Sequence, residues 1–243
     1  MSDIPMQRLT EFAGLNANDL ALFRSLFGPE KRISRRRDIR TQGDPVQEIF
    51  LLSSGWAVSC FDLRGGERQI VKLHTPGDVL GAPSLAMETA AETLVGMTDV
   101  TIRSMPLSAI GRIFKEAPSL AASLFISAQQ ERIFLMERLA SLGRMPAIKR
   151  FAVLLLHVHD RLVHIGRECG VVDWPFTQAD LADILGLTSV HVNRIMRSLD
   201  QQGLIKRRGS TVILSDLAAL RRLSELPERQ WIHGPDWLAQ IAL

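Results

Sequence analysis

Cysteine is scarce in this 243-residue chain, and its scarcity excludes two kinds of structure. The only cysteines are Cys60 and Cys169, which lie far apart in the sequence. Two thiols provide neither the disulfide framework of a small secreted protein nor a four-thiolate cluster. We therefore expect two reduced, partly buried thiols, and no metal or other cofactor.

Long apolar runs and a secretory leader are also lacking. No apolar stretch approaches the length of a membrane span, and residues Met1 to Glu11 do not resemble a signal peptide. The hydrophobic fraction of 46% is nevertheless enough for a substantial core and argues against global disorder. We expect a folded cytoplasmic protein without a membrane partner, long enough for two domains of ordinary size.

Motifs that carry enzymatic chemistry are missing as well. The sequence has no glycine-rich phosphate loop, no nucleophile elbow and no metalloprotease helix motif, so we do not expect an enzyme. His157, Asp160 and His164 have a helical spacing that a metal site could use. We interpret them as an exposed polar helix face, because ligand sets need tighter confirmation than spacing alone.

The first half of the chain changes texture once. Residues 1–30 have the spacing of short helices. From Ile33 to about Met105, short apolar runs alternate with turn signals such as Pro76-Gly77-Asp78, which predicts short strands. Several short strands at regular spacing are typical of a small barrel or sandwich.

Helical texture returns after Pro106, with a short helix over 108–116 and a long one from Ser119 to about Leu142. The long helix must bury its apolar stripe against its own barrel or against a second copy of itself. Two-fold pairing buries the same stripe twice, so we expect a homodimer. A hinge-like break at 143–146 precedes a further helix to about Leu162, and then a loop or small hairpin to Val172.

The run from Gln178 to Ile195 has the pattern of a helix-turn-helix. Ala182 supplies a small residue where the helices touch, and Gly186 tolerates a positive φ in the turn. Thr177 and Thr188 are suitable N-caps for the two helices. The inner face of the second helix is apolar at helical spacing: Val192, Ile195, Met196 and Leu199.

The outer face of the second helix carries polar and basic residues, and its N-terminal part is the part that reads base edges in the major groove. Arg194 can donate to guanine O6 and N7, and Asn193 or Ser189 can bind a base or a phosphate. In isolation, Arg194 would be read as a solvated surface arginine. The residues of this helix predicted to contact DNA are Thr188, Ser189, Val190, His191, Asn193, Arg194 and Arg197.

A basic wing is predicted after this helix. Gly203 ends the helix, and 204–206 and 211–214 are short strands around the tip Arg207-Arg208-Gly209-Ser210. The formal net charge is only +3, with a pI of about 9.2, and most short basic runs are solvated surface. This run lies in a nucleic-acid-binding frame, so we predict that Arg207 and Arg208 contact phosphates.

With these features the chain resembles the CRP/FNR family of transcription regulators over nearly its whole length. The matching residues are Gly43-Asp44, Gly55, Pro76-Gly77-Asp78, Gly81 and the run from Thr177 to Leu214. The resemblance implies an α+β fold with four parts. They are a jelly-roll barrel like a cyclic-nucleotide-binding domain (1–118), a dimerisation helix (119–143), a winged helix-turn-helix domain (144–226) and a C-terminal tail (227–243).

The resemblance also implies a function. It predicts a homodimeric, sequence-specific regulator on a palindromic promoter site in double-stranded DNA, with the recognition helix at about 188–202. RNA polymerase and a small-molecule effector of unidentified chemistry are the other expected partners. The alternative is a ligand-binding signalling protein whose helix-turn-helix contacts another protein.

Departures from the family concern the effector. Members that bind cyclic nucleotides have a Gly-Glu pair and, further along, an Arg that pairs with the phosphate. Here Gly81 is followed by Ala82, and Glu92 stands at the Arg position. Because a carboxylate repels a phosphate, we expect no cyclic AMP in the usual mode. Candidate effector-pocket residues are Gly81, Ala82, Pro83, Ser84, Glu92 and Thr93.

Other sensing modes of the family also fit poorly. The iron–sulfur branch uses four cysteines, and two cannot hold that cluster. His74 is a candidate haem ligand, but a lone histidine beside a turn is usually solvated. The barrel either senses an unidentified signal or is vestigial in an always-active protein. In the recognition helix, Val190 stands where many members have Glu, so it could touch a thymine methyl instead of accepting from cytosine.

Overall fold

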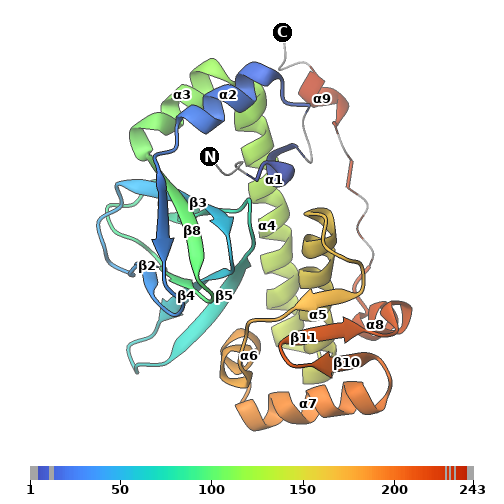
Figure 1. The fold of residues 1–243 in the computed structure, drawn as a ribbon. Helices are drawn as coiled ribbons and strands as arrows, with labels where there is room; N and C mark the ends of the chain where they lie inside the picture. The colour runs from blue at the N-terminus through green and yellow to red at the C-terminus, as the bar shows by residue number, and fades with distance from the viewer. Residues whose placement is uncertain (1–4, 11–13, 228, 230, 233, 240–243) are drawn as a thin grey trace. The chain divides into compact units, whose positions relative to one another are not determined.

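The computed structural model describes residues 5–10, 14–227, 229, 231–232 and 234–239 (Figure 1). The chain divides into two compact units. The first contains Met1–Gly66, Lys72–Arg132 and Gln230–Leu243, and the second contains Glu67–Val71 and Ile133–Arg229.

Short strands occupy the region in which apolar runs and turn signals alternate. They form two four-stranded sheets in the orders β1-β8-β3-β6 and β2-β7-β4-β5. The β3–β8 pair is antiparallel, as is β4–β7. This jelly-roll-like arrangement confirms the predicted barrel. The bounds are β1 (Glu30–Ile33), β2 (Asp38–Arg40), β3 (Glu48–Ser54), β4 (Ala57–Asp62), β5 (Arg68–His74), β6 (Val79–Leu80), β7 (Thr93–Gly96) and β8 (Val100–Pro106).

Strand β3 is apolar on both faces because it serves two cores. Successive side chains of a strand point to opposite faces. Phe50 and Leu52 join a cluster to which strands of both sheets contribute. Ile49 and Leu51 join a second cluster, which is completed by helices. A continuous apolar run is therefore required here, where a strand with one wet face would alternate.

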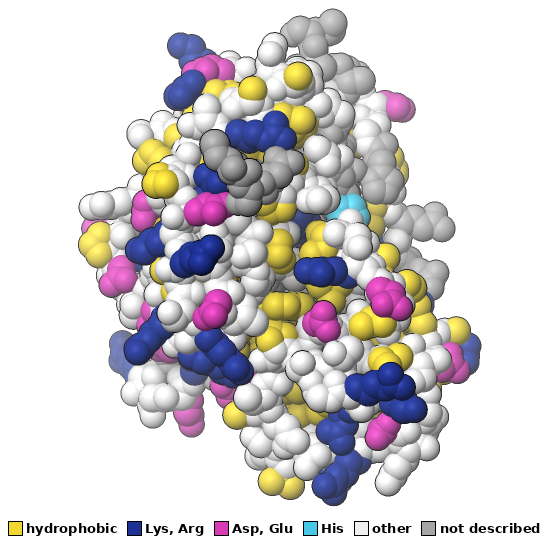
Figure 2. All heavy atoms as spheres, in the orientation of Figure 1, with side chains coloured by type: hydrophobic (Ala, Val, Ile, Leu, Met, Phe, Trp, Pro, Cys, Tyr) yellow, Lys and Arg dark blue, Asp and Glu magenta, His cyan; other side chains and the backbone are white. Residues whose placement is uncertain are grey.

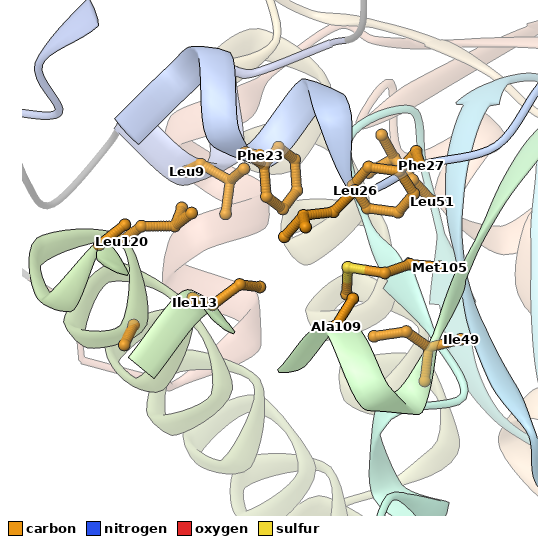
Figure 3. Packing of buried hydrophobic residues seen from close by; sticks show 12 residues of the cluster. Leu9, Phe23, Leu26, Phe27, Ile49, Leu51, Met105, Ala109, Ile113 and Leu120 are labelled. Carbon is orange, nitrogen blue, oxygen red and sulfur yellow. The ribbon is translucent and has the colours of Figure 1, made fainter. Parts of the chain in front are cut away.

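The helical cluster lies at one end of the barrel, where α1 (Gln7–Thr10), α2 (Ala17–Ser25) and α3 (Ile110–Glu116) meet the strands (Figure 1). Figure 3 shows side chains of these helices converging on those of β3 and β8. Phe23 and Phe27 pack edge to face, with ring centroids 4.8 Å apart. These contacts confirm the short helices predicted for the first 30 residues.

Helix α4 (Pro118–Arg144) is longer than predicted. It continues through Gly143 and Arg144, the first two residues of the predicted hinge, and the amide of Met145 still donates to the carbonyl of Ser141 at 2.9 Å. The break occurs at Pro146, which has no amide proton to extend the helix and is extended, with φ −55° and ψ 148°. Helix α5 (Ala147–His164) begins immediately afterwards.

The second unit contains a three-stranded sheet in the order β10-β11-β9. The segment before Val172, predicted as a loop or small hairpin, instead leads into β9, which pairs with β11. Three residues are too few to show a strand period, so no local pattern indicates β9. The bounds are β9 (Val171–Asp173), α6 (Gln178–Leu185), α7 (Ser189–Gln201), β10 (Ile205–Arg208), β11 (Thr211–Leu214) and α8 (Leu217–Ser224).

Three aromatic side chains form part of the core of this unit. Trp174 lies 6.5 Å from Phe151 and 5.4 Å from Phe176, measured between ring centroids. The cap of α8 is Asp216, whose carboxylate accepts from the amide of Ala219 at 2.8 Å. Within the described residues, no helix combines the length and the apolarity needed to cross a bilayer.

The C-terminal tail contains one more short helix, α9 (Asp236–Ala239). Leu238 is buried, whereas Trp237 is exposed and Trp231 is half-buried. Within its described residues, the tail therefore buries some apolar side chains and leaves others in solvent.

Candidate functional site

Local sequence signals set the geometry of the helix-turn-helix. The Thr177 hydroxyl accepts from the amide of Asp180 at 3.2 Å, and the Asp180 carboxylate accepts from the amide of Thr177 at 2.7 Å. Gly186 ends α6 with φ 63° and ψ 47°, which favours glycine. The Thr188 hydroxyl caps α7 through the amide of His191. These contacts confirm the predicted caps and turn.

The inner and outer faces of α7 differ as predicted. Val192, Ile195, Met196 and Leu199 are buried, and Ala182 is buried where α6 packs against α7. On the outer face, Thr188, Val190, Arg194 and Arg197 are exposed, while Ser189, His191 and Asn193 are half-buried. Val190 is 81% exposed. The structure therefore places the predicted contact residues of this helix within reach of a partner.

The wing is tighter than the sequence predicted. Arg208 pairs with Thr211, so β10 runs through both arginines and only Gly209 and Ser210 form the turn. Gly209 has φ 59°, and this allows the two-residue turn. Arg207 and Arg208 thus belong to a strand and not to the tip, and both are exposed. Figure 2 shows Lys and Arg side chains over the region that α7 and the β10–β11 hairpin occupy in Figure 1.

Three side chains that sequence reasoning missed hold the C-terminal end of α6. Gln69 donates to the carbonyl of Asp183, Arg138 to that of Ile184, and Arg150 to that of Leu185. Helix C-terminal carbonyls lack partners within the helix, and cations there oppose the negative end of the helix dipole.

Arg138 is the central member of this set. It also donates to the carbonyls of Ile70 and Val71, both at 2.6 Å. Burial lowers the pKa of Arg138 to about 10, so the guanidinium remains charged at neutral pH. Gln69 and Arg138 come from segments far from α6 in the sequence, as does Arg150, and no local sequence pattern predicts these contacts.

In the barrel, the predicted effector residues are brought together. Gly81 has φ 81° and precedes a 3-10 turn over Ala82–Ser84. The Ser84 hydroxyl donates to the Glu92 carboxylate at 3.2 Å and accepts from the amide of Ala91 at 3.1 Å. Thr93 donates to Asp62 at 2.6 Å. Pro83 is exposed and Ala82 half-buried, so they contribute less to this buried network.

Arg40 completes the network, although no sequence pattern pointed to it. Its guanidinium lies 3.3 Å from Glu92, and the two side chains expose only 6% and 4% of their surface. The same guanidinium approaches the backbone of Gly81, where an added Cβ would lie 2.8 Å from Nη2. Glycine is required at this position both for its backbone conformation and for the space that Arg40 occupies.

This arrangement does not fit a cyclic nucleotide. A cyclic phosphate needs an unneutralised cation, whereas the buried Arg40 of this cluster is already paired with the Glu92 carboxylate. The buried carboxylate itself would repel the phosphate. Ala82 and Glu92 stand where nucleotide-binding members of the family have Glu and Arg, and the paired state of Arg40 points in the same direction.

Two other candidates also find partners within the barrel. His74 is buried, contrary to the solvated position expected for it, because its Nε2 lies 2.8 Å from the Ser59 hydroxyl. Cys60 is buried, with its thiol 3.5 Å from the carbonyl of Thr93. In the part of the chain that the structure describes, no group of three or more His, Cys, Asp or Glu side chains could hold a metal ion.

Two predictions about the second unit need correction. Cys169 is exposed and not partly buried, since it lies in the turn that precedes β9. Asp160 and His164 are exposed, as predicted for a polar helix face, whereas His157 is half-buried and contacts Glu137 at 3.2 Å. Asp160 also accepts two hydrogen bonds from Arg221.

Comparisons with known proteins match both units. A Crp-like helix-turn-helix domain matches residues 149–223, and a cyclic nucleotide-binding domain matches 30–117. The transcriptional regulatory protein btr of Bordetella pertussis is 24% identical over 86% of this chain and 87% of its own. The nitrogen fixation regulation protein FixK of Bradyrhizobium diazoefficiens is 26% identical, covering 92% of this chain and 93% of its own.

A solved structure gives the same result for the fold. The structure of FixK2 from Bradyrhizobium japonicum superimposes with a TM-score of 0.73 at 24% identity, covering 82% of this chain and 98% of that one. The sequence relatives are transcription regulators, which are not enzymes.

Proposed function

Because the chain belongs to the CRP/FNR family of DNA-binding transcription regulators, we propose that it binds a palindromic promoter site as a homodimer, with α7 in the major groove. The observation that carries this proposal is the outer face of α7. A large apolar side chain, Val190, stands almost fully in solvent four residues before the exposed Arg194. An apolar contact and a guanidinium one helical turn apart match a thymine methyl and a guanine edge.

The other residues of the interface have separate roles. Arg194 donates to guanine O6 and N7, and Val190 covers a thymine methyl group. Ser189, Asn193 and Arg197 bind neighbouring bases or phosphates, as does His191. Thr188 is already occupied as the cap of α7, so it positions the helix at the phosphate backbone. In the wing, Arg207 and Arg208 neutralise phosphates and add affinity without sequence information.

A homodimer is supported by the exposed stripe of α4. Phe125, Met136 and Leu139 expose 60%, 60% and 72% of their surface. With Arg132 between them, these positions are seven, four and three residues apart, a spacing that keeps them on one face of a two-stranded helix pair. A second copy would cover these side chains. Two recognition helices related by this two-fold axis would suit a palindrome whose half-sites lie one helical turn, about 34 Å, apart.

The barrel is proposed to respond to a signal other than a cyclic nucleotide, because Ala82 and Glu92 stand where nucleotide-binding members have Glu and Arg, and the buried Arg40 is already paired with Glu92. Gly81, Ala82, Pro83, Ser84, Glu92 and Thr93 remain the candidate effector residues. RNA polymerase is the proposed protein partner at the promoter. The alternative, a helix-turn-helix that contacts a protein, predicts that binding of duplex DNA is weak and lacks the steep salt dependence of counterion release.

Selection of genomic DNA fragments by the purified protein at about 0.15 M salt tests the proposal. We expect the wild type to enrich a palindrome and Arg194→Ala to lose it or relax one position of each half-site. Arg112→Ala is the matched control, since it removes an exposed arginine of the barrel that pairs with Glu116. The proposal is wrong if the wild type enriches no sequence, or if Arg194→Ala and the wild type enrich the same one.

A further inference from the structure

A thiol, an imidazole, a carboxylate and a guanidinium form a chain of contacts between α5, α8 and the turn before β9. The Cys169 Sγ lies 3.6 Å from His159 Nε2. His159 Nδ1 lies 2.8 Å from the Asp160 carboxylate. Arg221 binds both oxygens of that carboxylate, at 2.8 Å and 3.2 Å. None of these four side chains belongs to the proposed DNA interface.

The backbone fixes which histidine nitrogen carries the proton. The amide of Gly170 donates to His159 Nε2 at 3.0 Å, and an amide can only donate. Nε2 therefore carries a lone pair, and the ring proton sits on Nδ1, where Asp160 accepts it. Although burial opposes the shift, hydrogen bonds from His159 and Arg221 lower the pKa of Asp160, which keeps the acceptor ionised. The thiol of Cys169 thus lies beside an unprotonated nitrogen whose lone pair already accepts from the Gly170 amide.

The two cysteines of the chain differ in both access and surroundings. Cys169 is exposed, while its neighbour His159 is only 3% exposed. A reagent in solution can reach the sulfur, and the base beside it is held in place by the protein. Cys60 is fully buried, out of reach of a reagent in solution, and its thiol lies 3.5 Å from the carbonyl of Thr93. Because the thiolate is the reactive form of cysteine, Cys169 has the surroundings of a reactive thiol and Cys60 does not.

The sulfur also lies next to a structural junction of the wing. Gly170, the following residue, donates to His159 and accepts at its carbonyl from the amide of Leu214 at 2.8 Å. It leads into β9, which pairs with β11, the partner of the strand that carries Arg207 and Arg208. A group attached to Cys169 would displace the contact between its sulfur and His159. It would thereby strain the adjacent hydrogen bond between the Leu214 amide and the Gly170 carbonyl.

We propose that Cys169 is a site of reversible thiol modification, which loosens the β9–β11 edge and weakens DNA binding. His159 Nε2 takes the thiol proton and, in doing so, loses the hydrogen bond from the Gly170 amide. The sulfur attacks one oxygen of a peroxide, forming an S–O bond as the O–O bond breaks. The sulfur is oxidised to a sulfenic acid, and the departing hydroxide takes up the proton as water. A small thiol then attacks this sulfur, forming a disulfide and releasing the hydroxyl group as a second water.

Mass spectrometry of the intact full-length protein after exposure to hydrogen peroxide and then glutathione tests the chemistry. We expect one added glutathione on the wild type and on Cys60→Ala, and none on Cys169→Ala. His159→Gln should slow the reaction about tenfold or more, because it removes the proton acceptor. Asp160→Asn changes an exposed side chain and should slow it in the same direction. Modification of Cys60 instead, or equal rates with and without the imidazole, overturns the proposal.

Hydrogen exchange at the amide of Leu214 tests the structural consequence without DNA. It should become at least several-fold faster in the modified wild type, and should not change in treated Cys169→Ala. The loss of DNA affinity, which rests on the proposed function, is measured on the same samples and should reverse on reduction. Unchanged exchange at Leu214, or unchanged DNA affinity of the modified protein, overturns the regulatory role. Failure of the unmodified protein to bind any duplex contradicts the proposed function but not the modification of Cys169, because the hydrogen-exchange measurement does not involve DNA.

Discussion

The guanidinium of Arg40 lies 3.3 Å from the carboxylate of Glu92, in the interior of the barrel and 52 residues away in sequence. Each member of the pair neutralises the charge of the other inside the barrel. An ionised group in a protein interior is tolerated when it is paired and hydrogen-bonded, and Ser84 supplies a further hydrogen bond to the carboxylate.

Removing one partner of this pair should destabilise the barrel strongly. Glu92→Ala leaves the Arg40 guanidinium buried without its counter-ion, and such changes cost about 3–5 kcal/mol. Urea unfolding measures the effect. Glu116→Gln, which breaks the exposed pair with Arg112, should leave the free energy of unfolding nearly unchanged. Replacing Arg40 and Glu92 together by apolar residues should restore much of the stability, and equal stability of Glu92→Ala and the wild type would refute the role given to the pair.

Removing an arginine from the recognition helix and removing one from the wing should affect DNA binding differently. Arg194→Ala should lose about 1–3 kcal/mol at one base pair of the half-site and little elsewhere. Arg208→Ala should weaken binding to all sequences alike and reduce the slope of log affinity against log salt by about 0.9 for each phosphate that it no longer neutralises. Titrations of matched and mutated operators at several salt concentrations separate the two. A base-specific loss in Arg208→Ala would show that the wing reads sequence.

The exposed stripe of α4 should be needed for assembly. Leu139→Glu places a charge among side chains that two copies would bury against each other, so we expect a monomer at micromolar concentration by light scattering. Phe114→Glu is the matched control, since Phe114 is 68% exposed but lies on α3. If the wild type is itself monomeric, or Leu139→Glu remains dimeric, α4 is not the dimer helix.

Acid should weaken the second unit through Glu137. A hydrogen bond from His157, followed by those from Arg229, holds the pKa of Glu137 below its ordinary value of 4.5. Because the pKa is lower in the folded state, the stabilisation is complete above pH 4.5 and is lost as the pH falls through and below that value. Unfolding by urea at a series of pH values should therefore show a smaller loss in acid for Glu137→Gln. Identical slopes for the two proteins would exclude this contribution.

Local signals explain what the sequence could predict. The caps at Thr177 and Thr188, the turn at Gly186 and the buried face of α7 depend on neighbours three or four residues away, and the structure confirms each of them. Likewise, turn signals marked the strands of the barrel. Patterns of this kind indicate which residues are buried or have a positive φ, and they do so from the local sequence alone.

Interactions between distant residues explain what the sequence could not predict. Nothing near Arg40 indicates a carboxylate 52 residues later, and the burial of His74 depends on Ser59 in another strand. The support of α6 by Arg138 and the position of His159 beside Cys169 are of the same kind. Each depends on tertiary packing. The helix and strand propensities of a short stretch of sequence are weak compared with the effect of that packing.

Val190, the exposed apolar residue of α7, gives operator binding two components with different thermal behaviour. Covering its side chain with a thymine methyl removes apolar surface from water, which lowers the heat capacity of the complex and is driven near 25 °C by solvent entropy. Ions screen the arginine contacts but not this one. Added salt should therefore lower overall occupancy while leaving the preference for thymine intact, and modest warming should sharpen that preference. Calorimetry with thymine and uracil operators, which differ by one methyl group, would resolve the two components.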